Sequence, residues 1–101
     1  MHILLTYTVC EDYPARRVPF RSAHLAHARA AFERGELALA GALDDPPDGA
    51  VLVFRGGDPA IAEMFARADP YVQNGLVTEW KTRKWSTVIG DGAKLPELPP
   101  E

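Results

Sequence analysis

Two short apolar runs separated by a polar turn constrain the fold of this chain more than any other feature of its sequence. Residues 37–43 (LALAGAL) and residues 50–54 (AVLVF) contain no polar or charged side chain. Residues 44–49 between them (DDPPDG) are of the kinds that favour a turn, so the pattern predicts an antiparallel hairpin. Because both faces of these two strands are apolar, both sides of the sheet that contains them need to be covered.

Two further strands and two helices are expected around this hairpin. Residues 3–9 alternate between two faces with the period of two that a strand requires. Residues 17–34 are mostly good helix formers and are followed by a glycine, which favours the end of a helix. Asp58–Pro59 is typical of a helix start, Asp69–Pro70 of a helix end, and residues 76–88 predict a last strand. The helical residues expected to face the core are Leu25, Ala28 and Phe32 in the first helix and Ile61, Met64, Phe65 and Ala68 in the second.

This order of elements, β-α-β-β-α-β, is typical of a ferredoxin-like α+β fold, in which two helices cover one face of a four-stranded antiparallel sheet. The other apolar face of the hairpin would stay bare, so we expect a homodimer in which two sheets pack face to face. The space between sheet and helices would then form a pocket for a small-molecule ligand. We expect one domain over residues 1–90 and a Pro-rich C-terminal tail over residues 91–101, either mobile or draped over a neighbour.

Charge and cysteine content argue against several classes of partner. The 101 residues carry 11 Lys and Arg against 14 Asp and Glu, a formal net charge of -3. Basic residues are not clustered with aromatic ones, which argues against nucleic acid and anionic membranes as partners. The chain lacks the roughly 20 consecutive apolar residues of a membrane span, and its start is typical of a strand and not of a signal peptide. Cys10 is the single cysteine, so we expect no intrachain disulfide and a cytoplasmic location.

The first predicted helix holds the residues best suited to chemistry. At about 100° per residue, Arg21 lies within roughly 10° of the centre of the apolar stripe, His24 about 70° from it and His27 about 130° from it. We therefore expect Arg21 and His24 to face inward or along the rim, and His27 to face outward. An arginine one turn before a histidine can hold an anion beside a proton-transfer group. The spacing also fits a salt bridge of Arg21 at the helix entrance and a structural role for His24.

Three other kinds of site find little support in the sequence. His24 and His27 are three residues apart, but no HExxH pattern, cysteine pair or suitably spaced carboxylate completes a metal site. The segment 55–58 (RGGD) lacks the GxxxxGK pattern of a phosphate-binding loop, and we interpret it as a turn before a helix. Nothing near Cys10 activates its thiol, which we expect to be unreactive. We accordingly expect neither a metal nor an organic cofactor.

Four stretches together resemble the YCII-related (YciI-like) family. They are RSAHLAH at residues 21–27, GELALAG at residues 35–41, ADPYVQNGL at residues 68–76 and RKW at residues 83–85. The resemblance covers nearly the whole chain, from the first predicted strand to Val88.

The resemblance implies a ferredoxin-like homodimer of the dimeric α+β barrel kind with a His–Asp pair as its active centre. By position, the histidine of the pair is His24, the aspartate is Asp69, and the family's helix arginine is Arg21. Asp69 would fix the tautomer of the His24 imidazole, so that the second ring nitrogen acts as a general base or acid. Taken alone, Asp69–Pro70 also fits a turn that ends a helix.

The family's characterised chemistry includes cofactor-free elimination of chloride from a hydroxylated aromatic ring. We therefore expect a small cofactor-independent enzyme of the lyase or isomerase type that acts on a cyclic or aromatic small molecule. His24 would move the proton, Asp69 would orient His24, and Arg21 would hold a carboxylate or enolate. Tyr7 and Trp80 either line the pocket or belong to the core. The alternatives are a non-catalytic small-molecule-binding or accessory module, since one fold carries many functions, and a cofactor-free oxygenase on the same scaffold.

Overall fold

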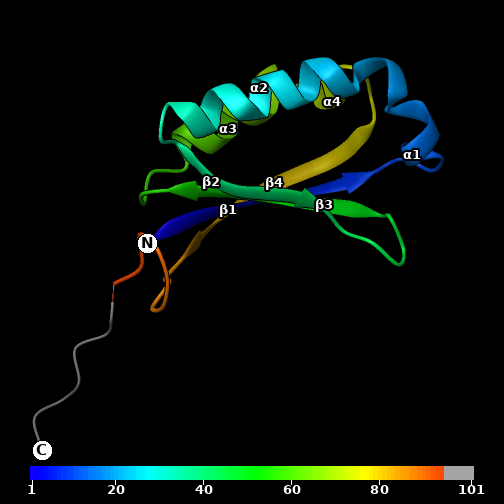
Figure 1. Cartoon of the computed structure of the whole chain (residues 1–101). Helices are drawn as coiled ribbons and strands as arrows, with labels where there is room; N and C mark the ends of the chain where they lie inside the picture. The colour runs from blue at the N-terminus through cyan, green and yellow to red at the C-terminus, as the bar shows by residue number, and fades with distance from the viewer. Residues whose placement is uncertain (95–101) are drawn as a thin grey trace, which may run out of the picture.

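A four-stranded antiparallel sheet carries the longer helices on one of its faces (Figure 1). This computed structural model describes residues 1–94 of the chain. The predicted α+β class and the predicted hairpin are confirmed. The strands follow one another across the sheet in the order β2-β3-β1-β4, with bounds β1 (His2–Val9), β2 (Leu37–Ala42), β3 (Gly49–Arg55) and β4 (Val77–Trp85).

The helix predicted over residues 17–34 is divided into shorter pieces. Within this range Pro19 lies in the first turn of a 3₁₀ segment, and Pro14 lies in the first turn of a separate short helix that precedes it. Proline lacks the N–H that a helix interior needs, so each of them fits the start of a helical segment and not its middle. The helical segments within residues 1–94 are α1 (Tyr13–Arg16), a 3₁₀ turn (Val18–Phe20), α2 (Arg21–Glu33), α3 (Ala60–Ala68) and α4 (Pro70–Gln73).

The ends of α3 follow the sequence signals. At its start, Asp58 Oδ1 accepts a hydrogen bond from the Ala60 backbone N–H at 2.9 Å. At its end, the backbone turns extended at Asp69 and Pro70 begins α4 at once. The sequence did not predict α4, although proline is favoured in a first helical turn.

The centre of the sheet supplies most of the core. On β1, Ile3, Leu5 and Tyr7 face the helices and are almost wholly buried. Alternate residues of a strand share a face, so the same side of the neighbouring strand is buried with them. Their cross-strand partners on β3 are Phe54, Leu52 and Ala50.

The apolar stripes predicted for the two helices are partly wrong. Leu25 and Phe32 of α2 are 49% and 56% exposed, and Met64 of α3 is 67% exposed. α2 lies above β2 at the edge of the sheet (Figure 1), so one flank of this helix is left open. Ile61 and Ala68 are also exposed, because α3 rests on the sheet through a face turned by one residue from the predicted one. In α2 and α3 the buried residues are Ala31, Ala62, Phe65 and Ala66.

An irregularity in β2 reverses the side to which its residues point. Leu37 pairs with Phe54, but the next residue of β3, Val53, pairs with Leu39, so Ala38 is an extra residue. One extra residue on one strand of an antiparallel pair is a β-bulge. Leu37 therefore faces the helices and is buried, whereas Leu39 faces the opposite side and is 71% exposed.

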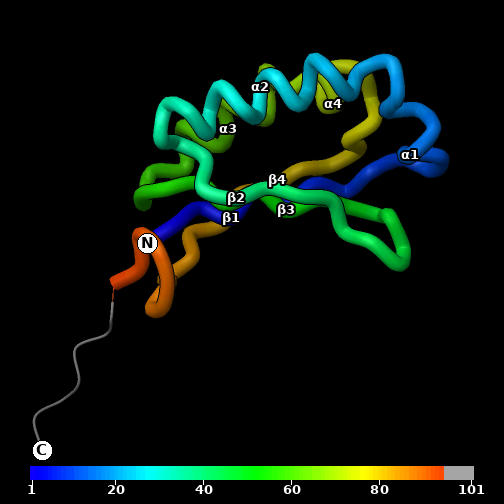
Figure 2. The backbone as a smooth tube through the Cα atoms, in the orientation of Figure 1, coloured from blue at the N-terminus to red at the C-terminus, as the bar shows by residue number. Residues whose placement is uncertain are grey.

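The two ends of the described chain lie side by side (Figure 2). The Met1 ammonium group donates to the Gly92 carbonyl oxygen at 2.8 Å, and the Lys94 N–H donates to the Thr87 carbonyl at 3.0 Å. Of the predicted tail, residues 91–94 belong to this loop, and residues 95–101 lie outside the described part of the chain. Within residues 1–94, none of the helices has both the length and the apolar character needed to cross a lipid bilayer.

The face of the sheet opposite the helices is apolar over three strands. Leu4 of β1 pairs with Val53 of β3, which in turn pairs with Leu39 of β2, and all three point away from the helices. Val51 lies on the same face, and its side chain, like those of Leu4 and Val53, is only half-buried. This strip is where a second sheet would pack.

We expect the protein to form a homodimer through this strip, because contiguous apolar surface is costly to leave in water. Light scattering at micromolar concentration should give the mass of two chains. Val53→Lys places a charge in the middle of the strip and should give a monomer that keeps its circular dichroism spectrum. Met64→Lys, on the exposed side of α3, serves as the control and should remain dimeric. A wild-type monomer would rule out this assembly.

Candidate active site

Asp69 lies between α3 and α4 and has no exposed surface. Its carboxylate accepts hydrogen bonds from the Tyr7 hydroxyl at 2.8 Å and from the Tyr71 backbone N–H at 3.0 Å. His24 Nδ1 lies 2.9 Å from Asp69 Oδ1 and 3.1 Å from Oδ2. Burying a carboxylate is costly unless its oxygens are paired, and these three donors offset that cost. The local chain explains the orientation, because Asp69 is the N-cap residue of α4.

α2 places His24 on the other side of this carboxylate. An ionised carboxylate can only accept hydrogen bonds, so the His24 proton sits on Nδ1 when the ring is neutral. The second nitrogen, Nε2, is then free to accept a proton. The His24 side chain is 17% exposed and lines a cleft, so a bound molecule can reach it.

The Tyr71 ring fixes the plane of the His24 imidazole. The two rings are stacked with their centroids 3.9 Å apart and an angle of 5° between their planes. Tyr13 contacts the Tyr71 ring edge-on, with centroids 5.8 Å apart and an angle of 88° between the planes. The imidazole is therefore held by a hydrogen bond at one atom and by stacking over its face.

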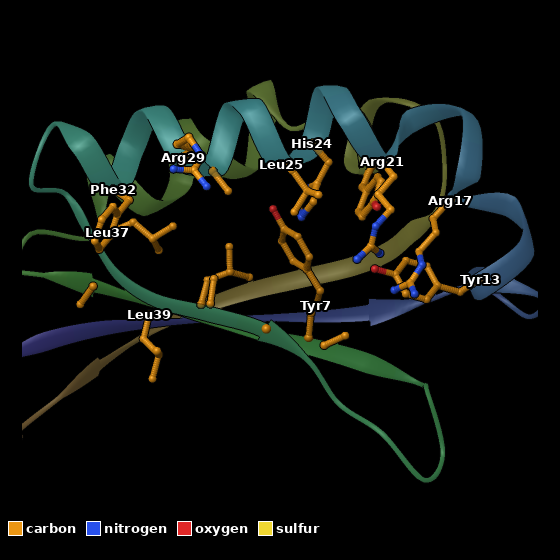
Figure 3. Close-up of a pocket in the computed structure, with 18 residues that line it drawn as sticks. Tyr7, Tyr13, Arg17, Arg21, His24, Leu25, Arg29, Phe32, Leu37 and Leu39 are labelled. Atoms are coloured by element: carbon orange, nitrogen blue, oxygen red, sulfur yellow. The ribbon is translucent and has the colours of Figure 1, made fainter.

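Tyr7 is a neutral donor to Asp69 at all ordinary pH values. Burial raises the pKa of the Tyr7 phenol well above its usual range, and the neighbouring Asp69 carboxylate raises it further. The hydroxyl proton is thus available for the hydrogen bond, which points from the floor of the site toward the helical layer (Figure 3).

A cleft of about 600 Å³ opens beside this site, between α2 and the β2 edge of the sheet (Figure 3). Small side chains create it, because no large group fills the space between helix and strand. The residues responsible are Ala28 on α2 and Ala38, Ala40, Gly41 and Ala42 along β2.

The lining of the cleft is positively charged, in contrast to the net charge of the chain. Arg17, Arg21 and Arg29 line it, and within residues 1–94 no aspartate or glutamate does. None of the three arginines forms a salt bridge with another described residue. Unpaired guanidinium groups that share a cleft favour an anionic ligand.

Comparison with known proteins assigns the chain to a family. The family model of the YCII-related domain matches residues 1–86. The chain belongs to the YCII-related family. The search of functionally curated proteins gives no match.

One solved structure shows the same fold as this YCII-related protein. It is 5-chloro-2-hydroxyhydroquinone dehydrochlorinase (TftG) from Burkholderia phenoliruptrix, in complex with 2,5-dihydroxybenzoquinone. The TM-score is 0.71 at 18% sequence identity, over 86% of this chain and 95% of that chain. The similarity supports the α+β architecture.

Four of the five residues predicted for the site of this YCII-related protein share one region. His24, Asp69 and Tyr7 are joined by hydrogen bonds, and Arg21 lines the cleft beside them. Trp80 does not line the cleft. It packs against the core elsewhere, with the Arg67 guanidinium 5.7 Å from its ring centre.

The prediction that His27 faces outward is wrong. It is half-buried, its Nε2 lies 3.0 Å from the Phe65 carbonyl oxygen, and its ring stacks on Phe65 at 4.2 Å. His27 is turned inward because its ring contacts Phe65 of α3. Cys10 lies outside the cleft, and its Sγ accepts a hydrogen bond from Arg16 at 3.3 Å. Among residues 1–94, no group of three His, Cys, Asp or Glu side chains is placed to hold a metal ion.

Sequence reasoning missed Tyr13, Arg17 and Tyr71. Tyr71 carried a local signal, because the residue two positions after an aspartate N-cap has its N–H at that carboxylate. Tyr13 and Arg17 are four residues apart, a helical spacing. Prolines between and beside them obscured the short helix that brings them to the cleft.

The raised pKa of Tyr7 predicts a specific loss of stability in alkali. Above the ordinary value of 10.0, the unfolded chain releases this proton and the folded chain keeps it, so the free energy of unfolding falls as pH rises. The slope for one such tyrosine is about 1.4 kcal/mol per pH unit. The free energy of unfolding can be measured with urea at several pH values between about pH 9 and pH 11.5. It should fall less steeply with pH in Tyr7→Phe than in the wild type. Equal slopes would contradict the burial of this hydroxyl.

Proposed function

We propose that this protein is a cofactor-independent enzyme of the lyase or isomerase type that moves a proton on a cyclic or aromatic small molecule. The proposal rests chiefly on one observation: buried Asp69 holds His24 through Nδ1 at 2.9 Å, and the ring lines a cleft. A histidine with one nitrogen fixed by a carboxylate is well suited to general base and acid catalysis.

The proposed step begins when His24 Nε2 takes a proton from a ring hydroxyl or from a carbon next to a carbonyl. The electron pair released by this proton forms an enolate. In an elimination, His24 returns this proton to the ring carbon that carries the leaving group, a second proton is then taken from another hydroxyl or C–H, and its electron pair moves through the ring while a leaving group such as chloride departs with its own bonding pair. In an isomerisation, His24 returns the proton to another carbon. Both routes balance without an oxidant or a reductant.

Arg21 supports this step by charge. Its guanidinium lies in the cleft next to His24 (Figure 3), where it can hold a carboxylate or the developing enolate oxygen. Asp69 keeps Nδ1 protonated, and Tyr7 keeps Asp69 in place. Neither Asp69 nor Tyr7 lies in the path of the proton.

The proposal includes the assembly that houses the site. A ferredoxin-like domain of residues 1–90 would pair with a second copy as a dimeric α+β barrel, with residues 91–101 as a tail. Membership of the YCII-related family and the shared fold with a dehydrochlorinase that binds a dihydroxybenzoquinone support a small cyclic ligand.

Turnover should be measured on compounds of this chemistry. The probes are 5-chloro-2-hydroxyhydroquinone, followed by chloride release, and 2,5-dihydroxybenzoquinone, followed by exchange of its ring protons in D₂O. We expect His24→Asn to lower the rate by about 10²–10⁴-fold, the usual contribution of a general base. His27→Asn, one turn away on the same helix and outside the cleft, is the matched control and should retain the wild-type rate. Equal rates for the wild type and His24→Asn would refute the proposal, and binding without exchange or release would favour a non-catalytic binding module.

The Asp69→Asn variant should separate the role of Asp69 in orienting His24 from any role in ligand binding. The amide still caps α4, but it cannot hold the His24 proton on Nδ1 as a carboxylate does. We expect the ¹⁵N chemical shifts of His24 to show a changed tautomer mixture, with a large fall in rate and a small change in ligand affinity. Unchanged His24 shifts would mean that Asp69 does not set the tautomer.

A further inference from the structure

The end of the cleft beside His24 has the chemistry of an anion site. Arg17, just before the 3₁₀ turn, and Arg21, at the start of α2, direct their guanidinium groups to this end, next to the Tyr13 ring (Figure 3). The Arg17 guanidinium carbon lies 5.3 Å from the centre of that ring. Neither arginine is in a salt bridge within residues 1–94, so two positive charges share this end without a counterion from the described chain.

Two phenol hydroxyls add donors at the same place. Tyr13 and Tyr71 both line the cleft, and neither hydroxyl forms a hydrogen bond within the described residues. Within residues 1–94 no fully buried side-chain oxygen lacks a hydrogen-bond partner, so both of these hydroxyls keep some exposed surface. Burial raises the pKa of Tyr71, while the charges of Arg21 and Arg17 act against that rise, so their positive field extends to this hydroxyl. Two guanidinium groups and two phenol hydroxyls together suit a carboxylate.

Apart from Arg29, the rest of the cleft lining is apolar. Leu25 and Phe32, both about half exposed, lie along it on α2, and Leu37 and Leu52 form its sheet side. At about 1.5 Å per residue, α2 extends roughly 16 Å from Arg21 to Phe32. A volume of about 600 Å³ lies within the range of sites for drug-sized ligands, so a single ring at the charged end would leave the apolar part empty.

We propose that the cleft binds an amphipathic organic acid, with one carboxylate between Arg17 and Arg21 and an extended apolar body along Leu25 and Phe32. This inference deepens the proposed function by naming the ligand class, and it rests on that function only for the chemistry assigned to His24. Arg29 also lines the cleft, but in Figure 3 its guanidinium lies against α2, farther from Tyr13 than those of Arg17 and Arg21. It is not part of the carboxylate site.

Calorimetric titration with three probes tests both halves of the ligand. Biphenyl-4-carboxylate carries the acid and the apolar body, biphenyl-4-carboxamide carries only the body, and acetate carries only the acid. We expect the carboxylate to bind at least tenfold more tightly than the carboxamide, and acetate to give no measurable heat at the same concentration. Equal affinity for the carboxylate and the carboxamide would overturn the anion site, and tight binding of acetate would overturn the role of the apolar body.

Substitutions then assign each half to its residues. Arg17→Gln should lower the affinity for biphenyl-4-carboxylate at least tenfold and leave the affinity for the carboxamide unchanged. Arg16→Gln, its neighbour outside the cleft, should change neither affinity. Phe32→Ala should weaken both biphenyl probes by a similar factor, with the exposed Met64→Ala as its control. Arg29→Gln should change the carboxylate affinity less than threefold. If Arg29→Gln lowered the carboxylate affinity as much as Arg17→Gln does, the single-carboxylate site would be contradicted.

The two proposals fail in different ways. His24→Asn leaves both arginines in place, so it should still bind biphenyl-4-carboxylate with nearly wild-type affinity. If the acid binds as expected but no substrate shows His24-dependent exchange or chloride release, the enzyme proposal fails and the ligand class stands. If turnover depends on His24 while the carboxylate binds no better than the carboxamide, the ligand class fails and the enzyme proposal stands.

Discussion

The buried carboxylate of Asp69 connects more of this molecule than any other group. Asp69 follows the end of α3 and caps α4. Its carboxylate accepts a hydrogen bond from the Tyr7 hydroxyl of β1 and holds His24 of α2. An unpaired charge at this depth would be unstable, so β1, α2 and α4, which supply its three donors, have to meet at this point. The same hydrogen bonds that make the helical layer and the sheet fit together therefore also set the geometry of the histidine.

The cleft combines two properties that arise from different parts of the sequence. Its space comes from the run of small residues along β2 facing an alanine of α2. Its charge comes from Arg17 and Arg21 at the start of the helical layer and from Arg29 farther along α2. The hydrophobic body of a ligand and its acidic group are thus recognised by separate elements. His24 lies where these two regions meet, held in plane by the stack on Tyr71. A ligand bound across both regions would bring its polar end to the imidazole.

Much of the fold could be predicted from local patterns, but the site could be predicted only in part. The alternation along β1 and the polar turn at residues 44–49 depend on neighbours in sequence, and they indicate the strands directly. His24 and Asp69 are 45 residues apart, so no spacing rule could pair them, and the pairing came from the family resemblance. Leu25 and Phe32 have the period of core residues because a cleft wall on a helix has the same period as a buried face. Periodicity alone cannot distinguish the two.

The extra residue in β2 ties the cleft to the far side of the sheet. With regular alternation after Leu37, Leu39 would project between α2 and the sheet and occupy the space that Ala40 leaves open. The cleft is therefore a property of backbone register as well as of side-chain size. An evolutionary change that straightened this strand would close the cleft and remove a leucine from the opposite face in a single event. Each of these two surfaces thus constrains how the other can diverge.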